Sequence, residues 1–278
     1  MTSITSETYD TLVLSGNSTN GIATLGALQK LHELHLLDDV LSYIGTSSGS
    51  ITSALLAIEY DPLEILSYIC ANKVYSKIPG FSLNNLINKG SLIKFDYMEE
   101  ILHNMIIEKL GYIPTLKQIK TYFNKSVTCV SYNITDNKRE YVSHENYPDL
   151  LVTKALRMSS ACPFIFEPFL YKDKYYIDGG ITDNFAMDYA QRLSDRCIGV
   201  CNTNPTTPYT ENCGYFNFIQ NLFVILIHSP SEYVIPKPDS KIIRLEYESS
   251  FFNFNSSEMD LIKLFDVGYD KCKSYLQN

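Results

Sequence analysis

Residues 40–58 read Val-Leu-Ser-Tyr-Ile-Gly-Thr-Ser-Ser-Gly-Ser-Ile-Thr-Ser-Ala-Leu-Leu-Ala-Ile, and this stretch decides the fold. Residues 40–44 carry β-branched and aromatic side chains, which predicts a strand. Residues 51–58 are rich in Ala and Leu, which predicts a buried helix. Between the two lies Gly45-Thr46-Ser47-Ser48-Gly49, so a strand is expected to enter a tight turn that opens directly into a helix.

The same order of elements occurs upstream. Residues 9–14 end in an apolar run, residues 15–20 form a polar loop, and apolar residues then recur at helical spacing from Ile22. Two successive strand-turn-helix units predict an α/β fold, a three-layer α/β/α arrangement around a mostly parallel central sheet. Further strands are expected at residues 127–132, 175–178, 197–201 and 242–247. Further helices are expected at residues 116–123, at about 149–158, from 185 and from 257, the last packing on the sheet.

Length and composition set the domain organisation. The chain has 278 residues, of which 45% are hydrophobic, and can bury one sizeable core. We find no repeat, low-complexity tract or linker, so we expect a single domain over residues 1–278. Residues 61–125 interrupt the strand pattern and read as helices and loops. They are a candidate helical cap over a site at the carboxyl ends of the strands.

Charge, cysteines and the N-terminus exclude several classes of protein. A formal net charge of -8 argues against nucleic acid as a partner, because such proteins hold phosphates through a basic surface. Seven cysteines cannot all pair within one chain, which favours a reducing compartment. Residues 1–10 lack the features of a secretory signal, and no apolar stretch is long enough to span a membrane. We expect an intracellular protein, cytoplasmic or peripheral at a membrane.

The turn at residues 45–49 matches Gly-x-Ser-x-Gly, a pattern that presents a nucleophilic serine. A nucleophile on so tight a turn needs small neighbours, which Gly45 and Gly49 provide. At the start of a helix, free backbone N–H groups and the positive end of the helix dipole point toward a developing oxyanion. Ser47 is therefore the candidate nucleophile, while Ser48 and Ser50 are expected to cap the helix.

The loop after the first strand, Leu14-Ser15-Gly16-Asn17-Ser18-Thr19-Asn20-Gly21-Ile22, resembles the oxyanion loop of the patatin-like phospholipase family. In that family the loop is a glycine-rich turn that ends in Arg or Lys and then Gly. The two glycines of the frame are kept, whereas Asn17 and Ser18 stand where glycines are usual and Asn20 replaces the basic residue. Asn adopts positive φ more readily than most residues, so Asn17 is expected to preserve the backbone shape.

Two later segments strengthen the resemblance. Residues 176–184, Tyr-Ile-Asp-Gly-Gly-Ile-Thr-Asp-Asn, resemble the family's Asp-Gly-Gly segment, and residues 155–166 resemble its Ala-x-x-x-Ser-x-Ala-x-Pro segment. Gly179 and Gly180 permit a tight turn after the carboxylate and close approach of another backbone. Ala186 replaces a usual proline, which we interpret as lost stiffness. With residues 127–133 as the central strand, the likeness runs in order from about residue 10 to 195.

The resemblance implies a Ser-Asp dyad. Asp178 takes the proton of Ser47 as the serine attacks an ester carbonyl, and N–H groups of Gly16, Asn17 and Ser18 hold the oxyanion. No metal and no organic cofactor is needed. The implied substrates are phospholipids, lysolipids or neutral glycerides at a membrane or micelle interface. The aromatic residues expected to touch such an interface are Phe81, Phe251, Phe252 and Phe254.

Two other interpretations remain open. The chain order Ser47, Asp178, His228 is also that of a Ser-Asp-His esterase, in which His228 would be the base. Alternatively, the chain is a catalytically degenerate member of the family that binds a lipid or a protein. The altered loop favours this second alternative, whereas the presence of both Ser47 and Asp178 with their flanking glycines favours an enzyme.

Overall fold

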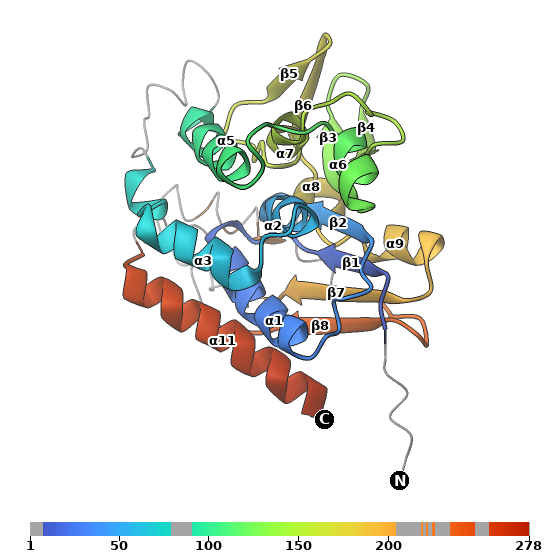
Figure 1. Cartoon of the computed structure of the whole chain (residues 1–278). Helices are drawn as coiled ribbons and strands as arrows, with labels where there is room; N and C mark the ends of the chain where they lie inside the picture. Colours follow the sequence, from blue (N-terminus) through green and yellow to red (C-terminus); the bar gives the residue numbers. More distant parts are fainter. Residues whose placement is uncertain are drawn as a thin grey trace.

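A central β-sheet organises the chain (Figure 1). The computed structural model describes residues 8–78, 91–203, 218, 221, 224–225, 234–247 and 256–277. The sheet has eight strands in the order β5-β6-β3-β2-β1-β7-β8, with β4 paired to β3 outside this path. The strands are β1 (Thr11–Leu14), β2 (Ser42–Thr46), β3 (Ser126–Asn133), β4 (Lys138–Val142), β5 (Phe169–Tyr171), β6 (Lys174–Asp178), β7 (Cys197–Asn202) and β8 (Lys241–Leu245). The helices are η1 (Ser18–Asn20), α1 (Gly21–Glu33), α2 (Ser48–Ala57), α3 (Pro62–Ala71), η2 (Tyr75–Lys77), α5 (Asp96–Leu110), α6 (Leu116–Phe123), α7 (Val152–Ser159), α8 (Gly180–Asp183), α9 (Met187–Leu193) and α11 (Glu258–Gln277).

The centre of the sheet is parallel. β1 pairs in parallel with β2 and β7, β2 with β3, and β7 with β8. Every residue of β1 and of β7 is buried, as expected for parallel strands that are covered on both faces. The predicted α/β fold with a mostly parallel sheet is confirmed.

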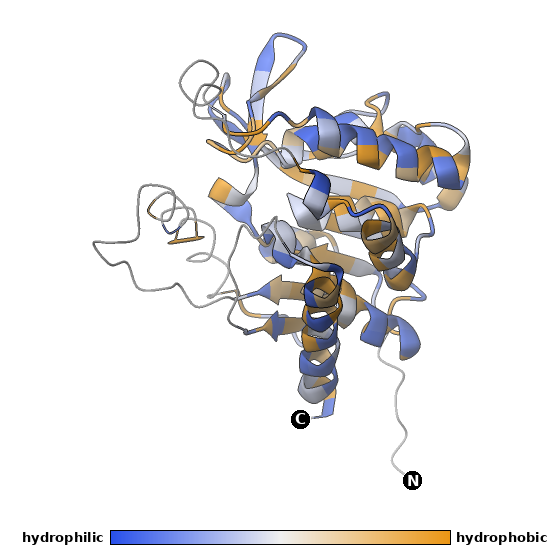
Figure 2. Cartoon of the chain, turned by 90° about the vertical axis from the view of Figure 1, so that its left-hand side faces the viewer, coloured by the Kyte–Doolittle hydropathy of each residue, from blue (hydrophilic) through white to orange (hydrophobic). Residues whose placement is uncertain are grey.

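The two faces of the sheet are covered by different helices. Leu12 and Leu14 of β1 join the larger core cluster, to which α1, α2, α3 and α11 contribute. Val13 points to the other face and joins a smaller cluster with residues of α9. Figure 2 shows hydrophobic residues on the strands and on the helix sides that face them, while the outer turns are hydrophilic. The predicted three layers are therefore present.

The C-terminal helix α11 packs mainly along α1, with a smaller contact to β8 (Figure 1). The expectation that it packs on the sheet is met only by this smaller contact, since its main contact is with α1. The reason is that glycines on both helices bring their backbones together. A Cβ on Gly268 would lie 1.8 Å from the Ala23 carbonyl oxygen, and one on Gly26 would lie 1.9 Å from the Phe265 carbonyl oxygen.

Antiparallel strands extend one side of the sheet, and the sequence patterns did not predict two of them. β4 reads Lys-Arg-Glu-Tyr-Val, and such a charged sequence suits an edge strand but hides its apolar periodicity. β5 is short and turns into β6 through Lys172 and Asp173. Both turn residues have positive φ, 48° and 61°, which is typical of a two-residue hairpin turn.

The helices of the candidate cap, residues 61–125, pack in two different parts of the structure. α3 and α5 line a pocket that is described below, whereas α6, whose predicted bounds match those observed, packs against β3. α3 and α6 both begin with capping boxes, at Asp61 and Thr115. The aromatic residues expected at a lipid interface, Phe81, Phe251, Phe252 and Phe254, lie outside the described residues.

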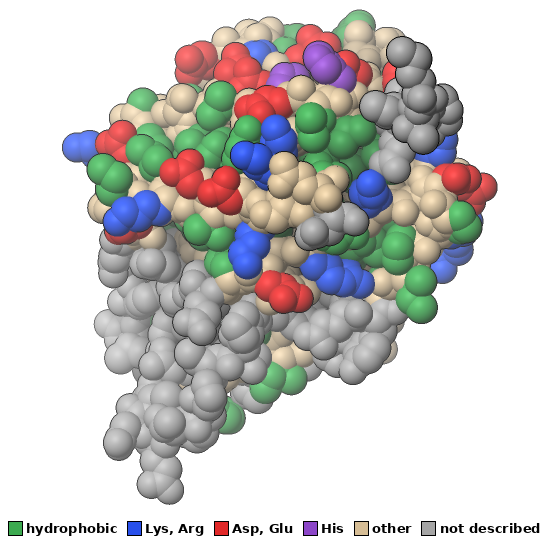
Figure 3. Space-filling model, turned by 90° about the horizontal axis from the view of Figure 1, so that it is seen from below, with side chains coloured by type: hydrophobic (Ala, Val, Ile, Leu, Met, Phe, Trp, Pro, Cys, Tyr) green, Lys and Arg blue, Asp and Glu red, His purple; other side chains and the backbone are tan. Residues whose placement is uncertain are grey.

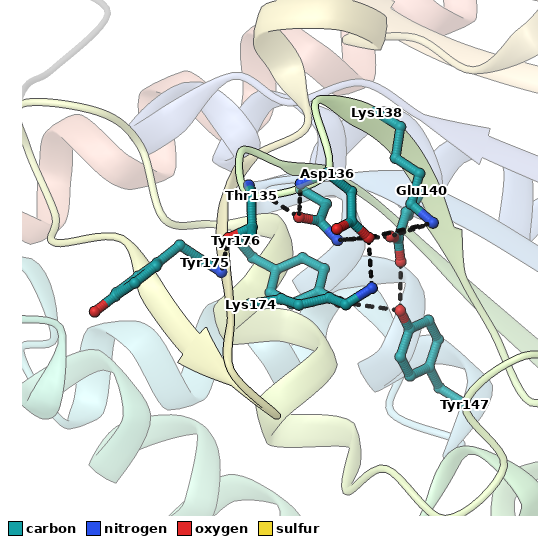
Figure 4. A network of polar contacts seen from close by, with 9 residues as sticks. Thr135, Asp136, Lys138, Glu140, Tyr147, Lys174, Tyr175 and Tyr176 are labelled. Atoms are coloured by element: carbon teal, nitrogen blue, oxygen red, sulfur yellow. Dashed lines mark hydrogen bonds and ion pairs between the residues drawn. The ribbon is translucent and has the colours of Figure 1, made fainter.

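A polar network at the far end of β3 holds the β3–β4 hairpin and β6 together (Figure 4). Asn133 Nδ2 donates to Asp136 Oδ2 at 3.2 Å and to Glu140 Oε1 at 2.9 Å. The Tyr147 hydroxyl contacts Glu140 and lies 3.0 Å from the Tyr176 hydroxyl. Since Asn133 pairs with Tyr176, the network supports the register in which Ser131 lies opposite Asp178.

The surface carries charges of both signs. Acidic and basic side chains are interspersed with hydrophobic ones on the face seen in Figure 3. The cysteines that the structure describes are all free thiols. Across the described ranges, we find no helix that combines the length and apolar character needed to cross a bilayer.

Candidate active site

Ser47 occupies the turn between β2 and α2. Its φ of 53° and ψ of -123° form a conformation that a residue with a side chain adopts only under strain. The turn is so tight that a Cβ on Gly45 would lie 2.4 Å from the Gly49 carbonyl oxygen. The Ser47 N–H donates to Ser159 Oγ at 3.0 Å, and Ser159 Oγ donates to the Val130 carbonyl oxygen. The strained turn is thus braced from a neighbouring helix and strand.

Asp178 ends β6 at the level of the sheet where β2 ends. Thr46 pairs with Val130 in β3, and Asp178 pairs with the next residue, Ser131. The Gly180 N–H donates to Asp178 Oδ1 at 2.8 Å. Gly179 permits this close arrangement, since a Cβ there would lie 2.4 Å from the Val130 carbonyl oxygen. Two strands thus bring Ser47 and Asp178 together although they are far apart in the sequence.

The Asp178 carboxyl is 3% exposed, and this burial raises its pKa to about 6 from an ordinary 3.8. A side-chain hydrogen bond from Ser47 and the backbone bond from Gly180 act in the opposite direction and stabilise the charged carboxylate. Burial is the larger effect, because a charge loses its hydration there. A carboxyl with a pKa near 6 is ionised at neutral pH and can still accept a proton readily.

The loop at residues 15–20 lies beside Ser47, lines the same pocket as Asp178 and has its own hydrogen bonds. The Gly16 N–H donates to the Asn184 carbonyl oxygen at 3.2 Å, and Asn184 Nδ2 returns a bond to the Gly16 carbonyl oxygen at 2.9 Å. The Asn17 N–H donates to Ser48 Oγ at 2.9 Å. Ser18 has φ 48°, so the left-handed residue of the loop is Ser18, whereas Asn17 has φ -156°.

The two serines expected to cap α2 have other roles. Ser48 Oγ accepts from the loop, as described, and Ser50 Oγ donates to the Ser47 carbonyl oxygen at 2.6 Å. The structure records no side-chain cap at this helix. Ser48 and Ser50 do not cap α2, because both lie inside the helix, after the N-cap position that Ser47 occupies.

The candidate nucleophile, base and oxyanion residues all line one pocket of about 150 Å³. Ser47 and Asp178 line it together with Gly16, Asn17 and Ser18. The rest of its wall is mainly apolar and comes from α1, α2, α3 and α5. Representative wall residues are Leu25, Leu55, Ile65, Ile101, Leu102 and Met105. Among the described residues that line the pocket, none is a histidine, and His228 lies outside the described part of the chain.

The order of the lining residues shows the direction in which the pocket extends. On α2 they run from Ser48, beside the candidate nucleophile, to Leu55. At about 1.5 Å per residue this is a length of roughly 10 Å. On α5 they continue from Met98 to Met105 with helical spacing. The pocket thus forms a channel that leads away from Ser47. Its walls are α1 and α2, which cover the sheet, and α3 and α5, which belong to the candidate cap.

Comparison with known proteins fits this geometry. Residues 12–190 match the family model of patatin-like phospholipases. The chain belongs to this family. A relative of this patatin-like chain is the probable lipid hydrolase 463L of Invertebrate iridescent virus 6, which is 29% identical over 270 residues, 92% of this chain and 89% of the relative. Another is the uncharacterized protein R571 of Acanthamoeba polyphaga mimivirus, 29% identical over 197 residues, 69% of this chain and 65% of the relative.

Two solved structures have the same fold. VipD from Legionella pneumophila superimposes with a TM-score of 0.57 at 17% identity, covering 97% of this chain and 67% of VipD. Human GIVD cytosolic phospholipase A2 superimposes with a TM-score of 0.53 at 11% identity, covering 98% of this chain and 62% of the human chain. At these identities the likeness shows the fold alone.

Proposed function

We propose that the chain cleaves carboxylic esters of lipids, with Ser47 as nucleophile and Asp178 as general base. The observation that carries this proposal is that Ser47, on a strained turn, and the buried Asp178 carboxyl line the same apolar pocket. Family membership supports a lipid hydrolase. The pairing of a strained serine with a carboxyl of raised pKa supports the dyad.

The proposed reaction has two halves. In the first, Ser47 Oγ bonds to the acyl carbon while its proton moves to Asp178. The ester C–O bond then breaks, and the alcohol leaves with that proton, so an acyl-serine remains. In the second half, water gives a proton to Asp178 as its oxygen attacks the acyl carbon. Ser47 recovers the proton when the carboxylic acid departs.

The oxyanion of each tetrahedral intermediate is proposed to lie beside Gly16, Asn17 and Ser18, where the N-terminus of α2 adds a favourable dipole. The Asn17 N–H bonds to Ser48 Oγ in this structure, and a rotation of the Ser48 side chain would free it for the oxyanion. The Gly16 N–H bonds to the Asn184 carbonyl and has the role of fixing the loop.

The substrate is proposed to be a phospholipid, a lysolipid or a neutral glyceride, whose acyl chain enters the channel along α2. The apolar wall favours a hydrocarbon chain, because water leaves both surfaces on binding. The lipid would be taken from a membrane or micelle interface, with α3 and α5 as the cap over the bound chain.

A fluorophosphonate probe tests the dyad directly. We expect wild type to carry the adduct on Ser47, as mass spectrometry would show. Ser47→Ala should carry none, and Asp178→Asn should react at least about tenfold more slowly because the base is lost. Ser53→Ala is a matched control, since Ser53 is a buried serine of α2, the helix that follows Ser47, and does not line the pocket. A folded wild type that stays unlabelled and hydrolyses no ester would instead favour a lipid- or protein-binding protein.

His228→Ala separates the dyad from the Ser-Asp-His alternative. If Asp178 is the base, the variant should keep kcat within about threefold of wild type on p-nitrophenyl butyrate. A triad would lose its base and about 10²-fold or more in kcat. Circular dichroism would confirm that the variant is folded, and a severe loss in a folded variant would rule out the dyad.

A further inference from the structure

The hydroxyl of Tyr247 forms hydrogen bonds with three buried asparagines. Two of them, Asn17 and Asn20, belong to the loop at residues 15–20, and the third is Asn202. The hydroxyl accepts a hydrogen bond from Asn17 Nδ2 at 3.2 Å. It lies 3.3 Å from both the Asn20 carbonyl oxygen and Asn202 Oδ1, which share its single proton as acceptors. None of the three asparagines is more than 2% exposed. Because buried polar groups need partners, these contacts together define where the loop lies.

The residues that hold the loop come from the far end of the chain. Tyr247 follows β8, and its ring packs against the larger core cluster. Asn202 ends β7, donates Nδ2 to Thr24 Oγ1 at 2.9 Å and donates its N–H to Ser15 Oγ at 3.2 Å. Tyr247 and Asn202 both lie outside residues 12–190, the segment that matches the family.

The loop needs external support because it lacks glycines in its interior. Ser18 has φ 48°, a conformation that is uncommon for a residue with a side chain. Asn17 precedes the turn η1 and Asn20 ends it. The Tyr247 hydroxyl bonds to both, so it holds the two ends of the turn that contains Ser18.

We propose that Tyr247 is a positioning residue for the oxyanion loop and that it acts through Asn17. Asn17 lines the pocket beside Ser47, whereas Tyr247 does not belong to the pocket wall. In this chain the side-chain contact holds a loop whose residues 17–20 include no glycine. The inference rests on the proposed function, since the loop has an oxyanion to hold only if Ser47 attacks an ester.

Tyr247→Phe tests the inference, because it keeps the ring and removes the hydroxyl. Loss of a whole oxyanion donor costs about 10²- to 10³-fold in kcat, so a displaced loop should cost about tenfold, with KM within about twofold of wild type. Rates would be expressed per active site, titrated with the fluorophosphonate, so that a loss of folded protein does not count. Tyr269→Phe is the matched control. Its hydroxyl bonds Glu33 Oε2 at 2.6 Å, away from the pocket, and kcat should not change.

A double mutant shows whether Tyr247 acts through Asn17. In an Asn17→Ala background, Tyr247→Phe should change kcat by less than about twofold, because the two changes remove the same contact. A further tenfold loss would overturn the inference. The inference would also be overturned if Tyr247→Phe lowered the melting temperature but left kcat per active site unchanged. That result would show that Tyr247 has a purely structural role. If wild type shows no Ser47-dependent turnover at all, the proposed function fails and this inference fails with it.

Discussion

Asp178→Asn is expected to abolish turnover and, at the same time, to stabilise the folded chain at pH 7. The amide cannot take a proton from Ser47, which should lower kcat by roughly 10³-fold. It can still accept the hydrogen bond that the Gly180 N–H gives to Asp178 Oδ1. The loss of activity should therefore come without loss of the fold.

The stability gain follows from the pKa of Asp178. This pKa is about 6 in the folded chain and an ordinary 3.8 when the carboxyl is exposed. The folded chain binds this proton more tightly, so the contribution of Asp178 to stability is full below pH 4 and is lost as the pH rises through 6. At pH 7 the buried charge costs on the order of 3 kcal/mol. Removing it should raise the melting temperature by roughly 5 °C.

Thermal melts at pH 4 and pH 7, with pH–rate profiles, would check both parts. The gain of Asp178→Asn over wild type should be present at pH 7 and nearly absent at pH 4. Wild-type kcat/KM should rise with pH through about 6 and then level off, as ionisation of the base requires. Asp239→Asn, at an exposed carboxylate, should change neither quantity. A variant that is less stable than wild type at pH 7 would contradict the burial argument.

Gly268→Ala is expected to destabilise the chain severely. Helix propensity alone would make this change favourable by about 1 kcal/mol in a helix interior. The contact between α11 and α1 works against it, because the new Cβ would lie 1.8 Å from the Ala23 carbonyl oxygen. The obstructing atoms belong to a backbone and cannot rotate away. Overpacking costs about 1–3 kcal/mol and sometimes more, so at the upper end of this range the packing effect should win, with a net loss of about 2 kcal/mol.

Urea unfolding would measure this loss. Lys273→Ala, at an exposed position of α11, is the control and should be nearly neutral. Gly26→Ala should be as damaging as Gly268→Ala, and the double variant should lose less than the sum, since both substitutions separate the same two helices. A Gly268→Ala chain that is more stable than wild type would show that the close contact does not constrain α11.

Local patterns in the sequence predicted the parts of the site that one short segment defines. Strand, turn and helix around Ser47 follow each other within residues 40–58, so propensities and the glycine pair were sufficient to find the turn. Asp178 was proposed from the resemblance of residues 176–184 to the family's Asp-Gly-Gly segment, not from local propensity. Ser47 and Asp178 end at the same level of the sheet because β3 pairs with both β2 and β6. The sequence predicted a mostly parallel sheet, but it did not predict the antiparallel pairing of β3 with β6.

The features that were missed depend on contacts between distant segments. Nothing near Tyr247 in the sequence indicates that its hydroxyl bonds to Asn17, and the polar partners come from separate elements. The strand β4 was hidden by its charged residues. The position of α11 depends on two glycines in different helices, and each of them alone looks like an unfavourable helix residue.

The contact between α1 and α11 also affects how the protein is made. α1 leaves the ribosome well before its partner surface, which lies in residues 258–277. During that interval the glycine-lined side of α1 has no native partner. The strand that carries Asp178 is translated after Ser47, so a nascent chain or a product truncated before β6 holds Ser47 without its proposed base. On the proposed mechanism, such fragments should not hydrolyse esters.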